Sequence, residues 1–195
     1  MKRPIVCIMT KVPQIGAVKT RLSRDIGPVA AWRFYVGTLR TLSRSVGRAP
    51  FWSARLLVTP DRGRYGWPMT LAKVKQGHGD LGDRMIAGLT SAPRGVPVIV
   101  IGCDIPGISV DILRDALRRL RRADVVFGPA TDGGYWLIGF SGRRGFWRPF
   151  ADVAWSTAHT LQDNQRNFRG RKIEFTAPLR DVDDVSAWLL ARGVP

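Results

Sequence analysis

A carboxylate directly after a short apolar run is the first feature of this sequence that could carry chemistry. The run is Val98–Ile101, bounded by Pro97 and followed by Gly102, and the carboxylate is Asp104. Four consecutive apolar residues are typical of a strand buried on both faces, and open parallel sheets bind ligands at the carboxyl ends of their strands. One carboxylate there suits Mg²⁺ or Mn²⁺, which take few protein oxygens and complete their shells with water and phosphate oxygens. A turn before the next helix would explain Asp104 equally well.

The loop between the first apolar run, Ile5–Met9, and residue 22 is basic. It holds one glycine and three cations: Gly16, Lys11, Lys19 and Arg21. A glycine allows close backbone approach and cations neutralise charge, so this composition predicts contact with phosphate. The loop is not a Walker loop, because that motif places its second glycine directly before Lys-Ser/Thr. We therefore do not expect a P-loop kinase.

Aspartates stand beside glycines, or beside one another, at three further places. In Gly79–Gly82, Asp80 precedes an expected helix, where free N–H groups could meet a ligand but an ordinary N-cap is the simpler interpretation. In Asp132–Gly134, adjacent glycines leave room for something to approach the backbone, although a tight turn would also explain them. A third cluster, Asp181, Asp183 and Asp184, lies before the last expected helix.

The chain is strongly basic, with 31 Lys+Arg against 15 Asp+Glu and a formal net charge of +16. Such a charge predicts attraction to polyanions, acidic membranes or phosphorylated small molecules, but a solvated basic surface also accounts for it. The best nucleic-acid candidate is an arginine cluster on the helix after Ser109: Arg114, Arg118, Arg121 and Arg122. It lacks interleaved exposed aromatic residues, so we expect a solvated helix face rather than a nucleic-acid site.

Strands and helices alternate throughout the 195 residues, with no repeat or low-complexity tract. Strands are expected at residues 5–9, 55–59, 71–76, 98–101, 124–128, 135–140 and 172–176, and helices at about 28–46, 81–91, 109–122, 158–168 and after 185. This pattern predicts one α/β domain over residues 1–195, a three-layer α/β/α sandwich around a mostly parallel, Rossmann-like sheet. Cys7 and Cys103 lie in apolar runs and should be reduced, buried thiols. No run is long enough for a signal peptide or a membrane span, so we expect a cytoplasmic protein.

Several motifs follow one another in an order that we know from one family. They are Lys19–Leu22, Gly79–Gly82 with Arg84–Met85, Gly102–Pro106, Gly128–Pro129 with Asp132–Tyr135 and Leu137–Gly139, Trp155–Thr157 and Asp181–Asp183. Together they resemble the bacterial glycosyltransferase-A-like family of nucleotide-diphospho-sugar transferases, which includes arsenosugar-biosynthesis glycosyltransferases. That family is related to the 2-phospholactate and molybdenum-cofactor guanylyltransferases. The resemblance runs from Lys11 to Asp183, nearly the whole chain.

The resemblance implies roles for these residues. Asp104 would be one ligand of Mg²⁺ or Mn²⁺ and Asp183, or alternatively Asp181, the second. Lys19 and Arg21, with Lys11, would contact phosphates. The nucleotide and the acceptor would lie against Gly79, Asp80, Leu81, Gly82, Asp132, Gly133 and Gly134, and Asp132 is the candidate acceptor base. The sequence departs from the family pattern at Asp184–Ala187, where Thr-Pro-Glu-Asp is expected, and at Trp136, where a tyrosine is more usual.

The function implied is metal-dependent transfer of a sugar from a nucleotide-sugar to a small acceptor. The alternative is nucleotidyl transfer from a nucleoside triphosphate to a phosphorylated acceptor, with release of pyrophosphate. A third hypothesis, a basic nucleic-acid-binding module, leaves Asp104, Asp132 and the glycines unexplained. The expected partners are a nucleotide or nucleotide-sugar and a small-molecule acceptor, and the sequence leaves the oligomeric state undetermined.

Overall fold

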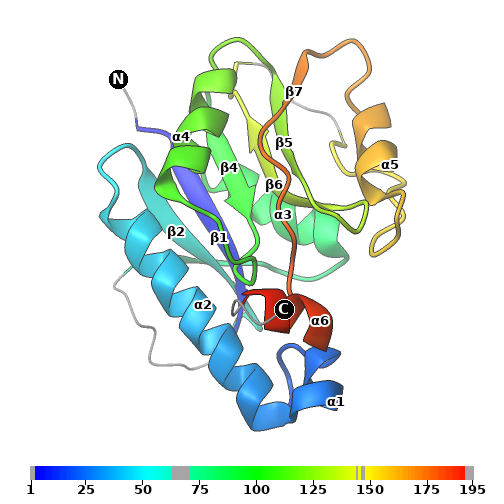
Figure 1. Cartoon of the computed structure of the whole chain (residues 1–195). Helices are drawn as coiled ribbons and strands as arrows, with labels where there is room; N and C mark the ends of the chain where they lie inside the picture. Colours follow the sequence, from blue (N-terminus) through cyan, green and yellow to red (C-terminus); the bar gives the residue numbers. More distant parts are fainter. Residues whose placement is uncertain (1–2, 63–70, 144, 146–147, 192–195) are drawn as a thin grey trace.

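A computed structural model describes residues 3–62, 71–143, 145 and 148–191 of the chain (Figure 1). Its strands form one seven-stranded sheet in the order β3-β2-β1-β4-β6-β5-β7. The strands are β1 (Ile5–Lys11), β2 (Ser53–Thr59), β3 (Ala72–Lys75), β4 (Val98–Ile101), β5 (Val125–Pro129), β6 (Tyr135–Phe140) and β7 (Ile173–Phe175). Only β6 runs against its neighbours, since it pairs antiparallel with β4 and β5 while the other strand pairs are parallel. The predicted mostly parallel α/β sheet is confirmed.

Helices cover both faces of the sheet, as predicted for a three-layer sandwich. They are α1 (Leu22–Ile26), α2 (Pro28–Arg48), α3 (Leu81–Thr90), α4 (Val110–Arg119), α5 (Thr160–Arg166) and α6 (Val185–Ala191). Alternate residues of each strand point to opposite faces. Val6 and Ile8 of β1 therefore pack with α2 and α4, whereas Ile5 and Cys7 pack in the core that α3 covers.

Local sequence explains where several elements begin. All four residues of β4 are buried, as its apolar run predicts. Pro28 occupies the first turn of α2, where its missing N–H costs no hydrogen bond. Ser109 caps α4, because its side chain accepts a hydrogen bond from the N–H of Ile112. Cys7 and Cys103 are free, buried thiols, as predicted.

The short helix α1 has no counterpart in the sequence-based interpretation, which placed a loop up to Leu22 and a helix from Pro28. It packs beside α6, from the opposite end of the chain (Figure 1). Leu22 and Ala31 share a small apolar cluster with Val182 and Ala187, so this tertiary contact stabilises a helix too short to form alone. No helix in the described parts of the chain is long and apolar enough to cross a membrane.

Candidate active site

A cleft of about 590 Å³ lies at the carboxyl edge of the sheet. Because β1, β4 and β5 are parallel to one another, the segments that follow these strands converge at this edge. The loop after β1, the residues after β4 and the turn after β5 all line the cleft. The segment after β7 reaches the cleft by running alongside β5, where Leu179 N donates to Pro129 O at 3.0 Å.

The ammonium group of Lys19 joins three of these segments. Its Nζ lies 2.8 Å from Oδ2 of Asp104 and 2.7 Å from Oδ1 of Asp183. Only 4% of the Lys19 side chain is exposed. Burial lowers the pKa of Lys19, but the charges and hydrogen bonds of the two carboxylates outweigh burial and raise that pKa above its ordinary value. Lys19 therefore stays protonated at neutral pH and lies between two carboxylates.

Lys19 has a strained backbone conformation in addition to its two ion pairs. Lys19 has φ 48°, in the left-handed region that costs a residue with a side chain about 1–2 kcal/mol. Its carbonyl accepts the N–H of Ser23, so the residue also starts the turn that leads into α1. The same residue therefore combines an unusual backbone conformation with the two ion pairs to Asp104 and Asp183.

The acidic side of the cleft contains a third aspartate, Asp181, whose pKa is shifted in the opposite direction to that of Asp183. Burial and the carboxylates of Asp183, Asp132 and Asp104 raise the pKa of Asp181 to about 6. Burial also acts to raise the pKa of Asp183, but the hydrogen bond and charge of Lys19 prevail and lower it. Arg21, with Nη1 3.5 Å from Asp183 Oδ2, acts in the same direction. Asp183, rather than Asp181, thus shares the Lys19 ammonium group with Asp104.

These carboxylates fit a hard divalent cation that takes few ligands from the protein. In the part of the chain that the structure describes, no group of three or more His, Cys, Asp or Glu side chains could by itself hold a metal. Two carboxylates suffice for Mg²⁺ or Mn²⁺, which keep water and phosphate oxygens as their remaining ligands. The donor set of Asp104 and Asp183 is therefore compatible with the ion that the sequence predicts.

A buried tyrosine fastens the start of the basic loop. The Tyr35 hydroxyl accepts the N–H of Lys11 at 2.8 Å and donates to the Lys11 carbonyl at 3.0 Å. The Cys103 thiol donates to the same hydroxyl at 3.2 Å, from the position next to Asp104. Burial is the main cause that raises the pKa of Cys103, to about 12, and it also raises that of Tyr35, so both groups stay protonated at neutral pH. No motif in the sequence points to Tyr35, so this role of its hydroxyl is visible only in the structure.

Gln76 is a second buried polar residue that sequence reasoning missed. Its Nε2 donates to the carbonyls of Thr10 at 3.1 Å and Leu57 at 2.8 Å, which ties the ends of β1 and β2 to the segment after β3. The only signal for Gln76 in the sequence is its place at the end of an expected strand, residues 71–76.

Lys11, predicted as a phosphate contact, lines the cleft and donates from Nζ to the Ala17 carbonyl at 2.8 Å.

At the rim, Asp80 is the N-cap of α3, as its position suggests. It forms a capping box with Asp83, in which Asp80 Oδ1 accepts the N–H of Asp83 at 2.9 Å. The indole Nε1 of Trp155 donates to Asp80 Oδ2 at 3.0 Å. Gly82 lies against the segment that contains Phe150 and Trp155, since a Cβ on Gly82 would come within 2.5 Å of Phe150 Cβ. Leu81 lines the cleft, but Gly79, Asp80 and Gly82 are not among its lining residues.

The turn after β5 contributes Asp132 and Gly134 to the cleft, whereas Gly133 is not among its lining residues. Asp132 is exposed, and its Oδ1 accepts the N–H of Gly134 at 2.9 Å. Gly133 has φ 87°, and a Cβ on it would lie 2.2 Å from the Ala158 carbonyl oxygen. Glycine is therefore required at position 133 by its positive φ and by the close approach of the loop that contains Ala158.

A protein-family model described as "Uncharacterized protein conserved in bacteria (DUF2064)" matches residues 41–157, more than half of the chain. The chain belongs to the DUF2064 family. No curated protein matches it by sequence.

Solved structures relate this DUF2064 chain to one group of folds. A protein from Desulfovibrio desulfuricans G20, provisionally named a nucleotide-diphospho-sugar transferase, is 25% identical, with a TM-score of 0.87 over 99% of this chain and 88% of that one. The 4-diphosphocytidyl-2C-methyl-D-erythritol synthase of Anaerococcus prevotii is 10% identical, with a TM-score of 0.61 over 98% and 97%. Glucosyl-3-phosphoglycerate synthase of Mycobacterium tuberculosis, solved with Mn²⁺ and UDP, is 7% identical, with a TM-score of 0.54 over 99% and 81%. The chain has the nucleotide-diphospho-sugar transferase fold that the sequence predicts.

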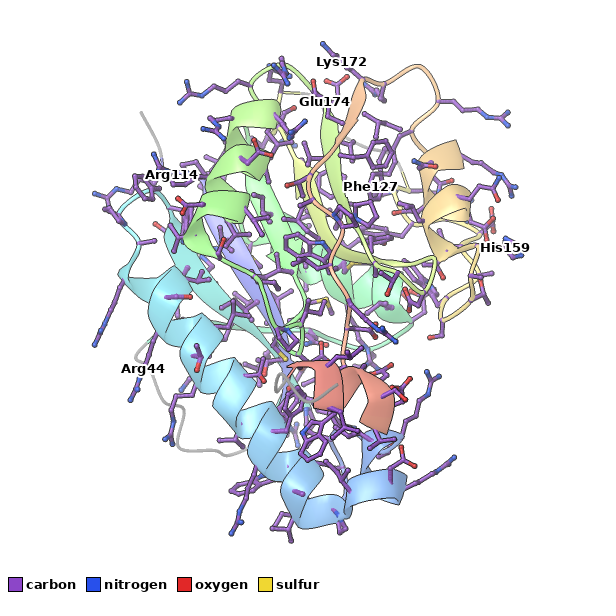
Figure 2. The ribbon with its side chains drawn as sticks, viewed as in Figure 1. Arg44, Arg114, Phe127, His159, Lys172 and Glu174 are labelled. Carbon is purple, nitrogen blue, oxygen red and sulfur yellow. The ribbon has the colours of Figure 1, made fainter. Side chains whose placement is uncertain are left out.

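The arginines of the DUF2064 chain are partly neutralised outside the cleft. Arg118 of α4 pairs with Asp115 at 3.0 Å, and Arg122, just after α4, pairs with Glu174 at 2.8 Å. Figure 2 shows Glu174 beside the end of α4 and Arg44 projecting outward from α2. Three of the four arginines considered as a nucleic-acid candidate are thus paired with carboxylates, since Arg114 also pairs with Asp111 at 3.5 Å. His159 projects from the outer edge of the molecule near α5 and is not among the cleft's lining residues (Figure 2).

Proposed function

We propose that this chain is a metal-dependent transferase that uses a nucleotide-sugar to glycosylate a small acceptor. The observation that carries the proposal is the meeting of Lys19 with Asp104 and Asp183 at the carboxyl edge of the sheet. A cation and two carboxylates in one cleft suit a substrate that carries a diphosphate and a divalent metal. The similarity to the Desulfovibrio protein, named for this class of reaction, supports the same assignment.

In this proposal the cations of the loop after β1 bind the diphosphate. Lys19, Arg21 and Lys11 line the cleft and would stabilise the negative charge that grows on the diphosphate as it leaves the sugar. Asp104 and Asp183 would hold Mg²⁺ or Mn²⁺, which when bound supplies further positive charge to the same leaving group. Pre-positioned charges of this kind usually make the largest single contribution to catalysis.

Asp132 is the candidate base for the acceptor. It lies in the cleft, and the Gly134 N–H orients its carboxylate through Oδ1. An acceptor hydroxyl would lose its proton to Asp132 as its oxygen bonds to the anomeric carbon, while the bond from that carbon to the diphosphate breaks. Asp132 is close enough to Asp181 to raise the pKa of that residue, so the base adjoins the acidic side of the site.

Nucleotidyl transfer is the second candidate, and the fold supports it independently. The Anaerococcus protein and a CMP-2-keto-3-deoxy-manno-octonic acid synthetase solved with CTP share this fold, the latter at 9% identity and a TM-score of 0.59. In that reaction an acceptor phosphate oxygen attacks the α-phosphorus of a nucleoside triphosphate and pyrophosphate leaves. A phosphate acceptor is already an anion, so this chemistry needs no base and would not depend on Asp132.

Ligand binding followed by product analysis tests the proposal. Thermal shift of the full chain is measured against nucleotide-sugars, nucleoside diphosphates and nucleoside triphosphates, each with and without Mn²⁺. A ligand at 100 times its dissociation constant should stabilise the fold by about 2.7 kcal/mol. Asp104→Ala should remove the metal-dependent part of the shift, whereas Asp111→Ala, on the exposed face of α4, should not. Release of a nucleoside diphosphate supports sugar transfer, release of pyrophosphate supports nucleotidyl transfer, and no shift with any nucleotide contradicts both.

A further inference from the structure

We propose that Lys19 is a displaceable counter-ion, which keeps the Asp104–Asp183 pair closed to divalent cations until a diphosphate draws its ammonium group away. The inference rests on the proposed function, because it takes the metal and the diphosphate as ligands of this cleft. It adds an order to their binding: the chain alone should bind metal poorly, and the diphosphate should create the metal site.

Cations already contact most of the carboxylate oxygens that a metal would need. Lys19 takes Oδ2 of Asp104 and Oδ1 of Asp183, and Arg21 lies 3.5 Å from Oδ2 of Asp183. A Mg²⁺ ion must approach its oxygen ligands to about 2.1 Å. The Lys19 nitrogen, 2.8 Å from Asp104 Oδ2 and 2.7 Å from Asp183 Oδ1, therefore competes with such an ion for the same carboxylate oxygens. A divalent cation beside the ammonium group would also be repelled by it.

Lys19 stays protonated at ordinary pH, because carboxylate oxygens lie 2.8 and 2.7 Å from its Nζ and favour the charged form. The ammonium group must therefore move rather than be neutralised. A lysine has a flexible four-carbon stem, so its charge can swing between partners without movement of the main chain. A diphosphate in the cleft would offer Lys19 more negative charge than either carboxylate does, and Lys19 and Arg21 both line that cleft.

The consequence is a reciprocal coupling between the two ligands. When Lys19 moves onto phosphate, the oxygens of Asp104 and Asp183 become available and the repulsion of an incoming metal falls. By linkage, a bound metal must then strengthen diphosphate binding by the same factor. Metal binding in the absence of any nucleotide should therefore depend on whether residue 19 carries a charge.

The test measures Mn²⁺ binding to the nucleotide-free full chain, with free Mn²⁺ detected by electron paramagnetic resonance. Lys19→Met should bind Mn²⁺ at least tenfold more tightly than the wild type. Lys19→Arg retains the charge and should bind Mn²⁺ as weakly as the wild type does. Lys11→Met is the matched control, because it removes a lysine of the same loop whose Nζ contacts the Ala17 carbonyl. That variant should gain far less Mn²⁺ affinity than Lys19→Met does, because its ammonium group contacts neither carboxylate. Asp104→Asn added to Lys19→Met should abolish the gain.

The inference is overturned if Lys19→Met binds Mn²⁺ no more tightly than the wild type, or if Lys11→Met gains as much. Lys19→Gln is measured in parallel and must show the same gain, so a folding defect of the methionine variant cannot decide the result; circular dichroism checks both. The proposed function fails separately, if the wild type shows no nucleotide binding in the thermal-shift experiment. If the wild type binds nucleotide but Lys19→Met shows no gain in Mn²⁺ affinity, the counter-ion inference is refuted and the proposed function is not.

Discussion

The indole nitrogen of Trp155 donates a hydrogen bond of 3.0 Å to Oδ2 of Asp80, the residue that caps α3. This bond joins the loop before α5 to the start of α3 across the rim of the cleft, because Trp155, Leu81 and Arg84 all line it. One wall of the candidate active site therefore depends on a contact between segments far apart in the sequence.

Trp155→Phe removes this hydrogen bond and keeps most of the ring. We expect the free energy of unfolding to fall by about 1 kcal/mol, because the bond is exposed, and ligand affinity to fall as well. A urea-denaturation double-mutant cycle with Asp80→Ala measures the coupling between the two residues. A coupling energy indistinguishable from zero would contradict this role for the bond.

Tyr35→Phe should destabilise the chain by about 1–3 kcal/mol, because the Lys11 N–H loses its partner at a partly buried position. The affinity for the phosphate-bearing substrate should also fall, since Lys11 begins the basic loop. Tyr135→Phe is the control for stability, because the Tyr135 hydroxyl donates only a weak bond of 3.9 Å to Met85 Sδ. Equal losses of stability in the two variants would show that the Tyr35 contacts are not special.

The raised pKa of Asp181 predicts that Asp181→Asn increases the free energy of unfolding by an amount that depends on pH. Burial and nearby carboxylates raise that pKa to about 6 in the folded chain, so folding favours the protonated acid and a penalty appears as pH rises from about 4 through 6. Asparagine avoids the penalty. The variant should be more stable than the wild type by on the order of 1 kcal/mol at pH 7.5, after allowance for solvent screening, and equal to it near pH 4. Urea denaturation of both proteins across this range measures the difference, and a difference independent of pH would refute the assignment.

Asp132→Asn separates the two candidate reactions. If Asp132 takes the proton of an acceptor hydroxyl, the amide should lower kcat by about 10²–10⁴-fold while nucleotide binding persists. If the reaction is nucleotidyl transfer to a phosphate, kcat should change little. Initial rates with the substrates identified by thermal shift give the answer, and Asp111→Asn controls for a change of charge alone.

Gly133→Ala should be strongly destabilising. The residue has φ 87°, and a methyl group would collide with the Ala158 carbonyl, so we expect a loss of about 2 kcal/mol or more. Gly170 has a similar φ of 75° but open space around it, so Gly170→Ala should lower the free energy of unfolding by only about 1 kcal/mol. Thermal unfolding of the two variants separates the effect of the collision from that of the backbone strain. Equal losses of stability would mean that the loop around Ala158 moves aside at no cost in free energy.

Much of the architecture was predictable because it follows from local rules. Four apolar residues make β4 a buried strand, Pro28 starts α2, and the side chains of Asp80 and Ser109 cap α3 and α4. Each of these depends on residues within one or two turns of the chain. The end of a buried strand also placed Asp104 at the carboxyl edge of the sheet without any knowledge of its partners.

By itself, the sequence determined the mostly parallel α/β fold, the buried strand that Asp104 follows and the basic character of the loop that holds Lys19. Only the tertiary structure decided that Lys19 stands between Asp104 and Asp183, that the Tyr35 hydroxyl fastens Lys11, and that Asp181 has a raised pKa. The physical reason is range. Strand and cap formation depend on neighbours along the chain, whereas an ion pair or a pKa depends on distances through space between segments that the sheet brings together.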